Sequence, residues 1–329
     1  MAKTRFAEKV VVITGASRGL GLLLAREFAG EGARLALLSR DRDDIESVRA
    51  DPGLQGCELL TLPCDVTSQR QVNRAIGRIG ESYGRIDVVV NNAGVIKAAP
   101  FSAMSAEDFE QAMGTHFWGP LYMTWASLPH LRRQAGRLVN ISSIGGALAV
   151  PHLAPYVASK YALAGLSESL TAELAEEGVR VTTVYPITIR TGSPFNITTG
   201  GQAEKEFSWF ALGDSLPVIS KNADRAARQI VNACAAGQPR LIVSTQARLA
   251  IIADALFPNL ISSLVKGVNR LLPEAAPDGP QARSGWESQT RITRSPLTRL
   301  TRRAAAHNRE MDTHVRRRAK RRLRSAPFS

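Results

Sequence analysis

Thr14-Gly15-Ala16-Ser17-Arg18-Gly19-Leu20-Gly21 follows directly on Lys9-Val10-Val11-Val12-Ile13, a run that is apolar from Val10 onward, near the start of a 329-residue chain. Lys9–Thr14 is predicted to be a buried strand, and the glycines predict a sharp turn into a helix that continues to about Ala29. Glycines let the backbone approach an anionic group, and the first turn of a helix attracts phosphate. The stretch therefore predicts a loop that can hold the pyrophosphate of a dinucleotide, although tight turns need glycine in any case.

Short apolar runs alternate with helical patterns up to residue 246. We expect further strands at Arg34–Ser39, Glu58–Pro63, Ile86–Asn91, Gly136–Ser142, Val179–Tyr185 and Arg240–Ser244. Helices are expected between them, at Asp43–Ala50, Gln69–Tyr83, Ala106–Gly114, His116–Arg133, Ala154–Glu177 and Asn222–Ala236. This alternation predicts an α/β fold, a Rossmann-like doubly wound parallel sheet, followed by a helical, basic C-terminal extension.

Charge is distributed unevenly along the chain. The formal net charge is +13, yet residues 281–329 hold 14 basic and three acidic residues, and the rest of the chain holds 28 basic and 26 acidic ones. This split predicts a domain boundary. We expect a catalytic domain over residues 1–246, an amphipathic helical segment over 247–273 that Pro258 divides, and a basic, poorly ordered tail over 274–329.

Several functions are open for the segments beyond the sheet. The apolar positions of 247–273 suit the cover of a lid, an oligomer interface, a membrane surface or plain subdomain packing, but their spacing does not suit a spanning helix. Seven of the ten residues 315–324 are basic. Such a run favours anionic lipid or another polyanion, or is simply a solvated tail. Sequence-specific nucleic-acid binding is not expected, because no aromatic platform accompanies it.

Composition also bears on the compartment and on metals. Residues 1–10 lack the long apolar run of a secretory signal, and the odd number of cysteines, Cys57, Cys64 and Cys234, suggests free thiols. We therefore expect a cytoplasmic protein, with or without peripheral membrane association. No metal is expected, because no cluster of His, Cys or acidic residues has ligand spacing.

A second motif, Tyr156-Val157-Ala158-Ser159-Lys160, lies on the helix expected at 154–177. Its four-residue spacing places a phenol and an ammonium group on one face of the helix. A nearby cation favours the phenolate, so Tyr156 is predicted to exchange a proton near neutral pH. Together with the glycine loop, the pair predicts a hydride-transfer enzyme whose proton donor is a tyrosine.

Four further motifs lie in a fixed order with these two: Cys64-Asp65-Val66, Asn91-Asn92-Ala93-Gly94, Asn140-Ile141-Ser142-Ser143 and Arg190-Thr191. Over about residues 6–245 the chain resembles the short-chain dehydrogenase/reductase family. The resemblance implies a Rossmann-like domain, a nicotinamide cofactor, a carbonyl or alcohol substrate and a homo-oligomer. Taken singly, each motif has an ordinary explanation as a turn, a helix cap or a surface pair.

The resemblance also implies roles for individual residues. Tyr156 would be the general acid/base, Lys160 would lower the pKa of Tyr156 and hold the nicotinamide ribose, and Ser143 would bind the substrate carbonyl. Asp65 and Val66 would contact the adenine, and Thr191 the nicotinamide or the phosphates. The full set of expected cofactor contacts is Gly15, Ser17, Arg18, Gly19, Leu20, Gly21, Arg40, Asp65, Val66, Asn92, Ala93, Gly94, Tyr156, Lys160, Pro186, Ile189 and Thr191.

The end of the second expected strand bears on the choice of cofactor. An acidic residue there would bind the ribose 2′-hydroxyl of NAD, whereas an arginine suits the 2′-phosphate of NADP. Arg40 stands at this place, and Arg18 in the glycine loop can reach the same phosphate. Asp41 follows directly, so a register shift of one would reverse the inference. We expect NADP(H) to be favoured over NAD(H).

Two residues depart from the family pattern. His116 stands where the family has an asparagine that supports a water in a proton relay; histidine can also hold a water or exchange protons itself. Ile187 follows Pro186 where the family usually has glycine, and its branched side chain restricts the backbone beside the nicotinamide. These departures keep a second interpretation open, a catalytically impaired NADP-binding sensor or scaffold, and the tail keeps open a membrane or polyanion adaptor.

The connection over residues 192–221 is long and carries Phe195, Phe207, Trp209 and Phe210. Loops of this length are commonly functional lids, and in the family this region closes over the substrate. Its apolar character predicts a small hydrophobic ketone, aldehyde or alcohol. The alternative is that the aromatic side chains only cover the end of the sheet.

Overall fold

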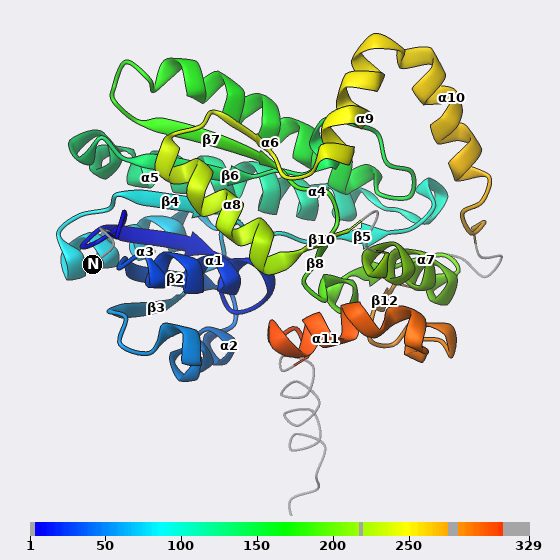
Figure 1. Ribbon diagram of the computed structural model, residues 1–329, viewed down its shortest axis with the longest axis horizontal. Coiled ribbons are helices and arrows are strands. Elements are labelled where there is room, and N and C mark those ends of the chain that lie inside the picture. Colours follow the sequence, from blue (N-terminus) through cyan, green and yellow to red (C-terminus); the bar gives the residue numbers. More distant parts are fainter. Residues whose placement is uncertain (1–3, 217–219, 276–281, 312–329) are drawn as a thin grey trace, which may run out of the picture.

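The central sheet consists of seven strands, all paired in parallel (Figure 1). The computed structural model describes residues 4–216, 220–275 and 282–311, and the basic run 315–324 lies outside this range. The strands are β1 (Val10–Thr14), β2 (Arg34–Ser39), β3 (Leu59–Pro63), β4 (Val88–Asn91), β6 (Arg137–Ile141), β7 (Arg180–Tyr185) and β11 (Arg240–Ile242). Their order is β11-β7-β6-β4-β1-β2-β3, so the chain reverses its winding between β1 and β4.

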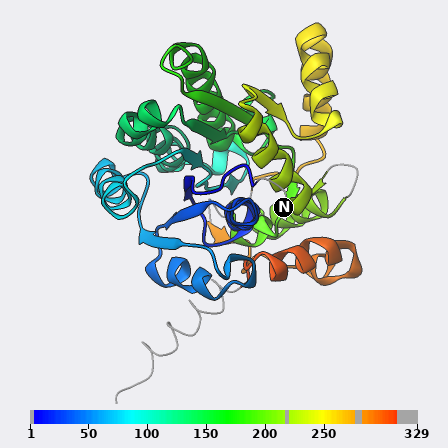
Figure 2. The same cartoon turned by 60° about the vertical axis from the view of Figure 1, so that its left-hand side comes forward.

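Helices cover both faces of the sheet (Figures 1 and 2). Those that pack on it are α1 (Gly19–Gly30), α2 (Arg42–Glu46), α3 (Gln69–Tyr83), α5 (Gly119–Gln134), α6 (Ala154–Glu173) and α8 (Ala223–Ala236), and α4 (Ala106–Met113) packs on α6. Alternate residues of β1 supply the two cores: Val11 and Ile13 pack with α1 and α8, and Val10 and Val12 pack with α3 and α5. A strand that is buried on both faces must be apolar throughout, which explains the valine runs.

The predicted fold class is confirmed. Every predicted strand begins and ends within two residues of the observed one. The largest differences among these helices are at two C-terminal ends. α2 ends at Glu46 and continues to Ala50 as a 3-10 turn, and α6 ends at Glu173 and continues only as turns towards Glu177. The two helices expected at 106–133 are joined by one π-helical turn, Gly114–Trp118, which carries His116.

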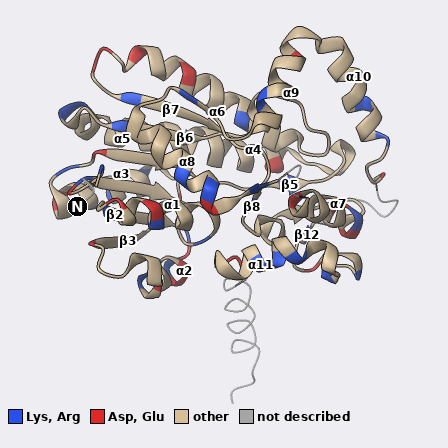
Figure 3. Cartoon of the chain, in the orientation of Figure 1, with Lys and Arg blue, Asp and Glu red and all other residues tan. Residues whose placement is uncertain are grey.

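A helical hairpin projects from the body of the molecule beside β11. It consists of α9 (Thr245–Leu256) and α10 (Pro258–Asn269), so the predicted amphipathic segment is divided at Pro258 as expected. Figure 3 shows few charged positions on it. Its apolar side chains face solvent, with exposures between 48% and 67% at Leu249, Ile252, Leu256, Phe257, Leu260, Leu264, Val268 and Leu271. No helix in the described part of the chain is both long enough and apolar enough to cross a membrane.

The C-terminal extension differs from its expectation of poor order. Residues 282–311 form β12 (Arg283–Ser284), two 3-10 turns at Ile292–Arg294 and Pro296–Thr298, and α11 (Arg299–His307). They pack against the lid region, which contains β9 (Thr198–Thr199) and α7 (Ala203–Ser215). Small strands complete this part of the fold: β5 (Lys97–Ala98), β8 (Ile189–Arg190) and β10 (Lys221–Asn222). We call residues 299–311 the C-terminal strap.

The aromatic residues of the lid region divide into two groups. Phe195 and Phe207 are buried in a small third core with Ala305 of the strap, and Trp286 stacks on Phe195 at 4.8 Å between ring centroids. Trp209 is 46% exposed. The composition did not indicate this arrangement, because the extension contributes only Ala305, Trp286 and Met311 to this core.

Candidate active site

The glycine loop connects β1 to α1 at the carboxyl edge of the sheet, next to the reversal of winding. Gly15 and Gly19 have positive φ values of 65° and 59°, which only glycine adopts at low cost. A side chain on Gly21 would collide with the carbonyl oxygen of Gly15. Ser17 Oγ lies 3.2 Å from Ser39 Oγ, so the loop is tied to the end of β2. Backbone of this shape fits a dinucleotide pyrophosphate.

Asn92 and Ala93 hold the other side of this loop. Asn92 Nδ2 donates to the carbonyl oxygens of Thr14 and Gly15 at 2.9 and 3.2 Å. The backbone amides of Asn92 and Ala93 donate to Thr14 Oγ1 at 3.0 and 3.1 Å. The motif Asn91–Gly94, whose last residue is exposed, thus fixes the position of the glycine loop. The same residues that form the turn after β4 also hold this loop.

Ser143, Tyr156 and Lys160 lie together at the ends of β6 and the start of α6. Ser143 Oγ accepts the Gly145 amide at 3.1 Å and hydrogen-bonds the phenol of Tyr156. Lys160 Nζ lies 5.7 Å from the centre of the Tyr156 ring and donates to the Ile141 carbonyl at 2.7 Å. Ser142, the neighbour most easily confused with Ser143, instead donates to the Lys160 carbonyl at 3.0 Å. The structure therefore brings the predicted catalytic groups into one cluster.

The ionisation of this cluster differs from the sequence-based expectation. Burial raises the pKa of Tyr156, and the hydrogen bond with Ser143 opposes this only in part. Burial also lowers the pKa of Lys160 to about 7. Burial of Lys160 therefore weakens the charge that was expected to favour the phenolate. Tyr156 is held in its protonated form at neutral pH.

His116 is buried, and both of its ring nitrogens have protein partners. Nε2 accepts a hydrogen bond from the Val95 amide at 3.1 Å, so the proton is assigned to Nδ1, which lies 2.8 Å from Ser159 Oγ. Burial, and secondarily the charge of Lys160, holds the pKa of His116 well below its ordinary value. The ring meets that of Tyr156 edge-on at 5.4 Å. In this arrangement His116 positions the start of α6, and neither nitrogen is left for a relay water.

Arg18 and Gly19, two of the expected phosphate-binding residues, contact the C-terminal strap. Arg18 Nε lies 3.0 Å from Glu310 Oε2, and Arg18 Nη1 lies 3.8 Å from Asp44. The Gly19 amide donates to the carbonyl of Asn308 at 2.9 Å. The carboxylate of Glu310 sits where a side chain on Gly19 would be. The donor set of the loop thus suits oxygen anions, and in this structure residues of the same chain provide them.

The residues expected near the adenosine lie around the ends of β2 and β3. Arg40 is exposed, and Asp41 caps α2 by accepting the amides of Asp43 and Asp44. Asp65 accepts the amide and hydroxyl of Thr67 at 3.0 and 2.8 Å. Arg40 is therefore the exposed residue at the strand end, whereas the half-buried Asp41 is engaged in the helix cap.

The remaining expected contacts lie beyond β7, at the start of α1 or after β3. The Pro186 carbonyl accepts the Ile144 amide at 2.7 Å, and Ile189 is buried in the core. The Thr191 carbonyl accepts Asn308 Nδ2 at 3.1 Å. Ile187 does not adopt a positive φ, so its branched side chain causes no backbone strain. Leu20 packs on the core that α1 covers, and Val66 is buried against Gly119.

Sequence reasoning missed three residues of this site: Ser159, Asn308 and Glu310. Ser159 lies within the tyrosine motif, but its partner His116 is 43 residues away. Glu310 is one of only three acidic residues in the basic stretch 281–329. This rarity was the only sequence feature that could have drawn attention to it. Nothing in the sequence pattern pairs it with Arg18.

The fold and this cluster define a nicotinamide-dependent oxidoreductase, and comparison with known proteins gives its family. The family described as short chain dehydrogenase matches residues 9–199. The chain therefore belongs to the short-chain dehydrogenase/reductase family, whose members use a nicotinamide cofactor and act on alcohol or carbonyl groups.

Individual relatives span most of the chain. It is 32% identical over 270 residues to the fatty acyl-CoA reductase of Acinetobacter baylyi, covering 81% of this chain and 86% of that protein. It is 33% identical to the putative oxidoreductase SadH of Mycobacterium tuberculosis, covering 82% of this chain and 99% of that protein. The 11-beta-hydroxysteroid dehydrogenase-like 4A of Arabidopsis thaliana is 34% identical, covering 78% and 84%.

A solved structure agrees with the fold. Levodione reductase superposes with a TM-score of 0.63 and 24% identity, covering 74% of this chain and 99% of that chain. At this identity the likeness establishes the fold alone.

Proposed function

We propose that the protein is an NADP(H)-dependent reductase of hydrophobic ketones or aldehydes, able to oxidise the matching alcohols. The observation that carries this proposal is the grouping of Ser143, Tyr156 and Lys160 at the carboxyl edge of the sheet, beside the glycine loop. The bound nicotinamide would supply the hydride. The chain's own residues must then hold the substrate oxygen and provide a proton.

The ionisation state of the site favours reduction. Ser143 is placed to donate a hydrogen bond to the substrate oxygen, and Tyr156 to give that oxygen a proton as it gains negative charge. A tyrosine whose pKa is raised by burial is fully protonated at neutral pH, which suits a general acid. Lys160, on the same helix face, is placed to hold the ribose and to return a proton to the tyrosine.

The substrate class rests on the apolar lid region and on the relatives. Trp209 is exposed and Phe210 is only partly buried on α7, so apolar surface remains available there. The printed names of two relatives concern a fatty acyl-CoA and a hydroxysteroid, both with large apolar parts. Arg18 and Arg40 support NADP(H) over NAD(H), because two guanidinium groups flank the end of β2.

The decisive experiment compares the wild type with Tyr156→Phe. We expect both proteins to bind NADPH, measured by nicotinamide fluorescence, and only the wild type to reduce a panel of hydrophobic ketones and aldehydes. Binding without turnover in the wild type would favour the impaired sensor or scaffold. Turnover that survives in Tyr156→Phe would reject the proposed acid.

A specific observation supports a second role, peripheral association with an anionic lipid surface. The α9–α10 hairpin projects from the body (Figures 1 and 3), and its large apolar side chains are exposed to solvent. Lys266 and Arg270, towards the carboxyl end of α10, are basic, and the run 315–324 adds seven basic residues. Exposed apolar side chains beside cations are the combination that binds the interface of anionic bilayers. A homo-oligomer that buries the same face is the competing arrangement.

A further inference from the structure

The C-terminal strap is seated in a notch that is shaped for it. Gly192 has a φ of 93°, and a side chain there would collide with the backbone of Ala305 in α11. Ala305 is fully buried and packs with Phe195 and Phe207. Thr301, one turn earlier, donates to Asp214 Oδ2 at 2.8 Å. The close approach of two backbones fixes the position of the residues that follow α11.

Those residues carry the polar groups of the strap to the cofactor loop. Asn308 and Glu310 are only 2% and 4% exposed. The carbonyl of Asn308 accepts the Gly19 amide, and its side-chain amide donates to the Thr191 carbonyl. The carboxylate of Glu310 accepts from Arg18 and, at 2.6 Å, from Asn196 Nδ2. The strap thus engages three expected cofactor-binding residues, Arg18, Gly19 and Thr191.

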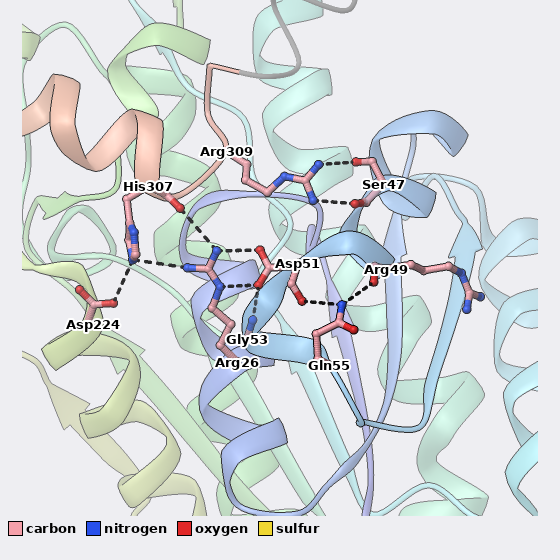
Figure 4. A network of polar contacts seen from close by, with 9 residues as sticks. All are labelled: Arg26, Ser47, Arg49, Asp51, Gly53, Gln55, Asp224, His307 and Arg309. Atoms are coloured by element: carbon pink, nitrogen blue, oxygen red, sulfur yellow. Dashed lines mark hydrogen bonds and ion pairs between the residues drawn. The ribbon is translucent and has the colours of Figure 1, made fainter.

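The outer side of the strap is held by side chains of the body (Figure 4). Arg309 donates to the carbonyl and the hydroxyl of Ser47, both at 2.8 Å. Arg26, which forms a bidentate pair with Asp51, also donates to the His307 carbonyl at 3.4 Å. A surface hollow runs along these contacts and is lined by the same residues. Solvent therefore reaches one side of the strap.

From these contacts we infer that the C-terminal strap is an intramolecular inhibitor that competes with the dinucleotide cofactor for the glycine loop. The Asn308 carbonyl accepts the hydrogen bond of the Gly19 amide in the first turn of α1, and the Glu310 carboxylate forms an ion pair with Arg18. These are the donors that the phosphates of the cofactor need under the proposed function, on which this inference rests. A phosphate and a carboxylate repel each other and cannot share the same donors, so cofactor binding requires the strap to withdraw.

Three features of the strap favour its withdrawal from the glycine loop. Between residues 305 and 310 its only apolar side chains are the methyl groups of two alanines, and Met311 is only partly buried against the third core, so withdrawal exposes a limited apolar surface. Burial raises the pKa of Glu310 despite the opposing effects of Arg18 and Asn196, which shows that holding this carboxylate in place is costly. Arg309 also adopts a φ of 59°, which non-glycine residues rarely take. The closed form lowers apparent cofactor affinity in proportion to the fraction of molecules that are open.

The first test uses full-length Glu310→Ala, with Glu287→Ala as the matched control. Glu287 lies in the same extension, and its carboxylate bonds Ser284 away from the glycine loop. We expect Glu310→Ala to bind NADPH about tenfold more tightly than the wild type, and Glu287→Ala to bind like the wild type. Equal or weaker binding by Glu310→Ala would overturn the inference, since weaker binding would make Glu310 part of the cofactor site.

A second pair of variants displaces the strap without altering its polar groups. Ala305→Arg cannot seat against Gly192, whereas Ala306→Arg places the same side chain on the exposed side of α11. We expect tighter NADPH binding only in Ala305→Arg. If this variant fails to fold, amide hydrogen exchange of the wild type tests the inference instead. We expect saturating NADPH to increase exchange at residues 299–311. Unchanged protection of these residues would overturn the inference.

These experiments separate the inference from the proposed function. If neither the wild type nor the released variants bind NADPH or NADH, the proposed function fails and the inference fails with it. If all variants bind NADPH with one affinity, the proposed function stands and the strap is not an inhibitor.

Discussion

Nδ1 of His116 lies 2.8 Å from Ser159 Oγ, and this contact joins the π-helical turn before α5 to the second turn of α6. Ser159 Oγ in turn donates to the Tyr156 carbonyl at 2.9 Å. A histidine that departs from the family pattern therefore reaches the backbone of the predicted proton donor through one hydroxyl. The contact positions Tyr156 and does not itself provide a proton path.

This relationship predicts the effect of His116→Asn. A shorter side chain cannot span from Val95 to Ser159, so at least one buried hydrogen bond is lost, at a cost of about 1–3 kcal/mol. We expect turnover within an order of magnitude of the wild type and a lower midpoint of thermal unfolding. His130→Asn, at a partly exposed histidine of α5, is the control for the loss of an imidazole. A loss of activity far beyond tenfold with an unchanged KM would show that His116 acts in proton transfer.

Lys160 predicts a pH-dependent stability. Its pKa in the folded protein is about 7, against 10.5 when unfolded, so between these values the unfolded chain binds more protons. Folding stability therefore rises with pH across this window, by about 1.4 kcal/mol per pH unit. The penalty for burying the charge is complete below pH 7 and disappears towards pH 10.5.

Lys160→Met removes this dependence. We measure the free energy of unfolding by urea denaturation. We expect Lys160→Met to be most stable relative to the wild type at or below pH 7. As the pH is raised to 9, the free energy of unfolding of the wild type should increase relative to that of Lys160→Met. Lys205→Met, at an exposed position of α7, should show no such trend. A constant difference between wild type and Lys160→Met at all pH values would contradict the burial effect.

Arg40 predicts cofactor selectivity. Arg40 is exposed at the end of β2, where it can form a charge-assisted hydrogen bond with a 2′-phosphate. We expect Arg40→Ala to weaken NADPH binding by about tenfold or more and to leave NADH binding nearly unchanged. Arg42→Ala, two residues further on, is the control. Arg18→Ala should lose the same selectivity, but it also frees the strap. Equal losses for both nucleotides would refute the assignment to NADP(H).

The α9–α10 hairpin predicts binding to lipid. We expect the wild type to sediment with vesicles of phosphatidylcholine and phosphatidylglycerol, and Leu256→Glu/Leu264→Glu to remain in the supernatant. Leu297→Glu changes an equally exposed leucine outside the hairpin and should sediment like the wild type. Deleting residues 315–329 should weaken sedimentation without altering soluble turnover. If the double variant instead dissociates a dimer in analytical ultracentrifugation, the face is an interface between copies.

The sequence predicted much of the fold because its signals are local. Val10 to Ile13 are apolar on both faces of β1, and Gly15, Gly19 and Gly21 are required by backbone shape, so single residues reveal the strand and the loop. The spacing of Tyr156 and Lys160 likewise follows from helical periodicity. These features need only neighbours in the chain.

Only the tertiary structure decided the electrostatics and the strap. Burial depends on every element packed around α6, and it set the pKa shifts of Tyr156 and Lys160 against the effect expected from their spacing. The contact between Arg18 and Glu310 joins residues from opposite ends of the chain. Since the strap docks through alanines, Met311 and polar groups, it leaves no hydrophobic periodicity in the sequence. Its position is fixed by the shape of the folded surface at Gly19 and Gly192, which exists only after the sheet has formed.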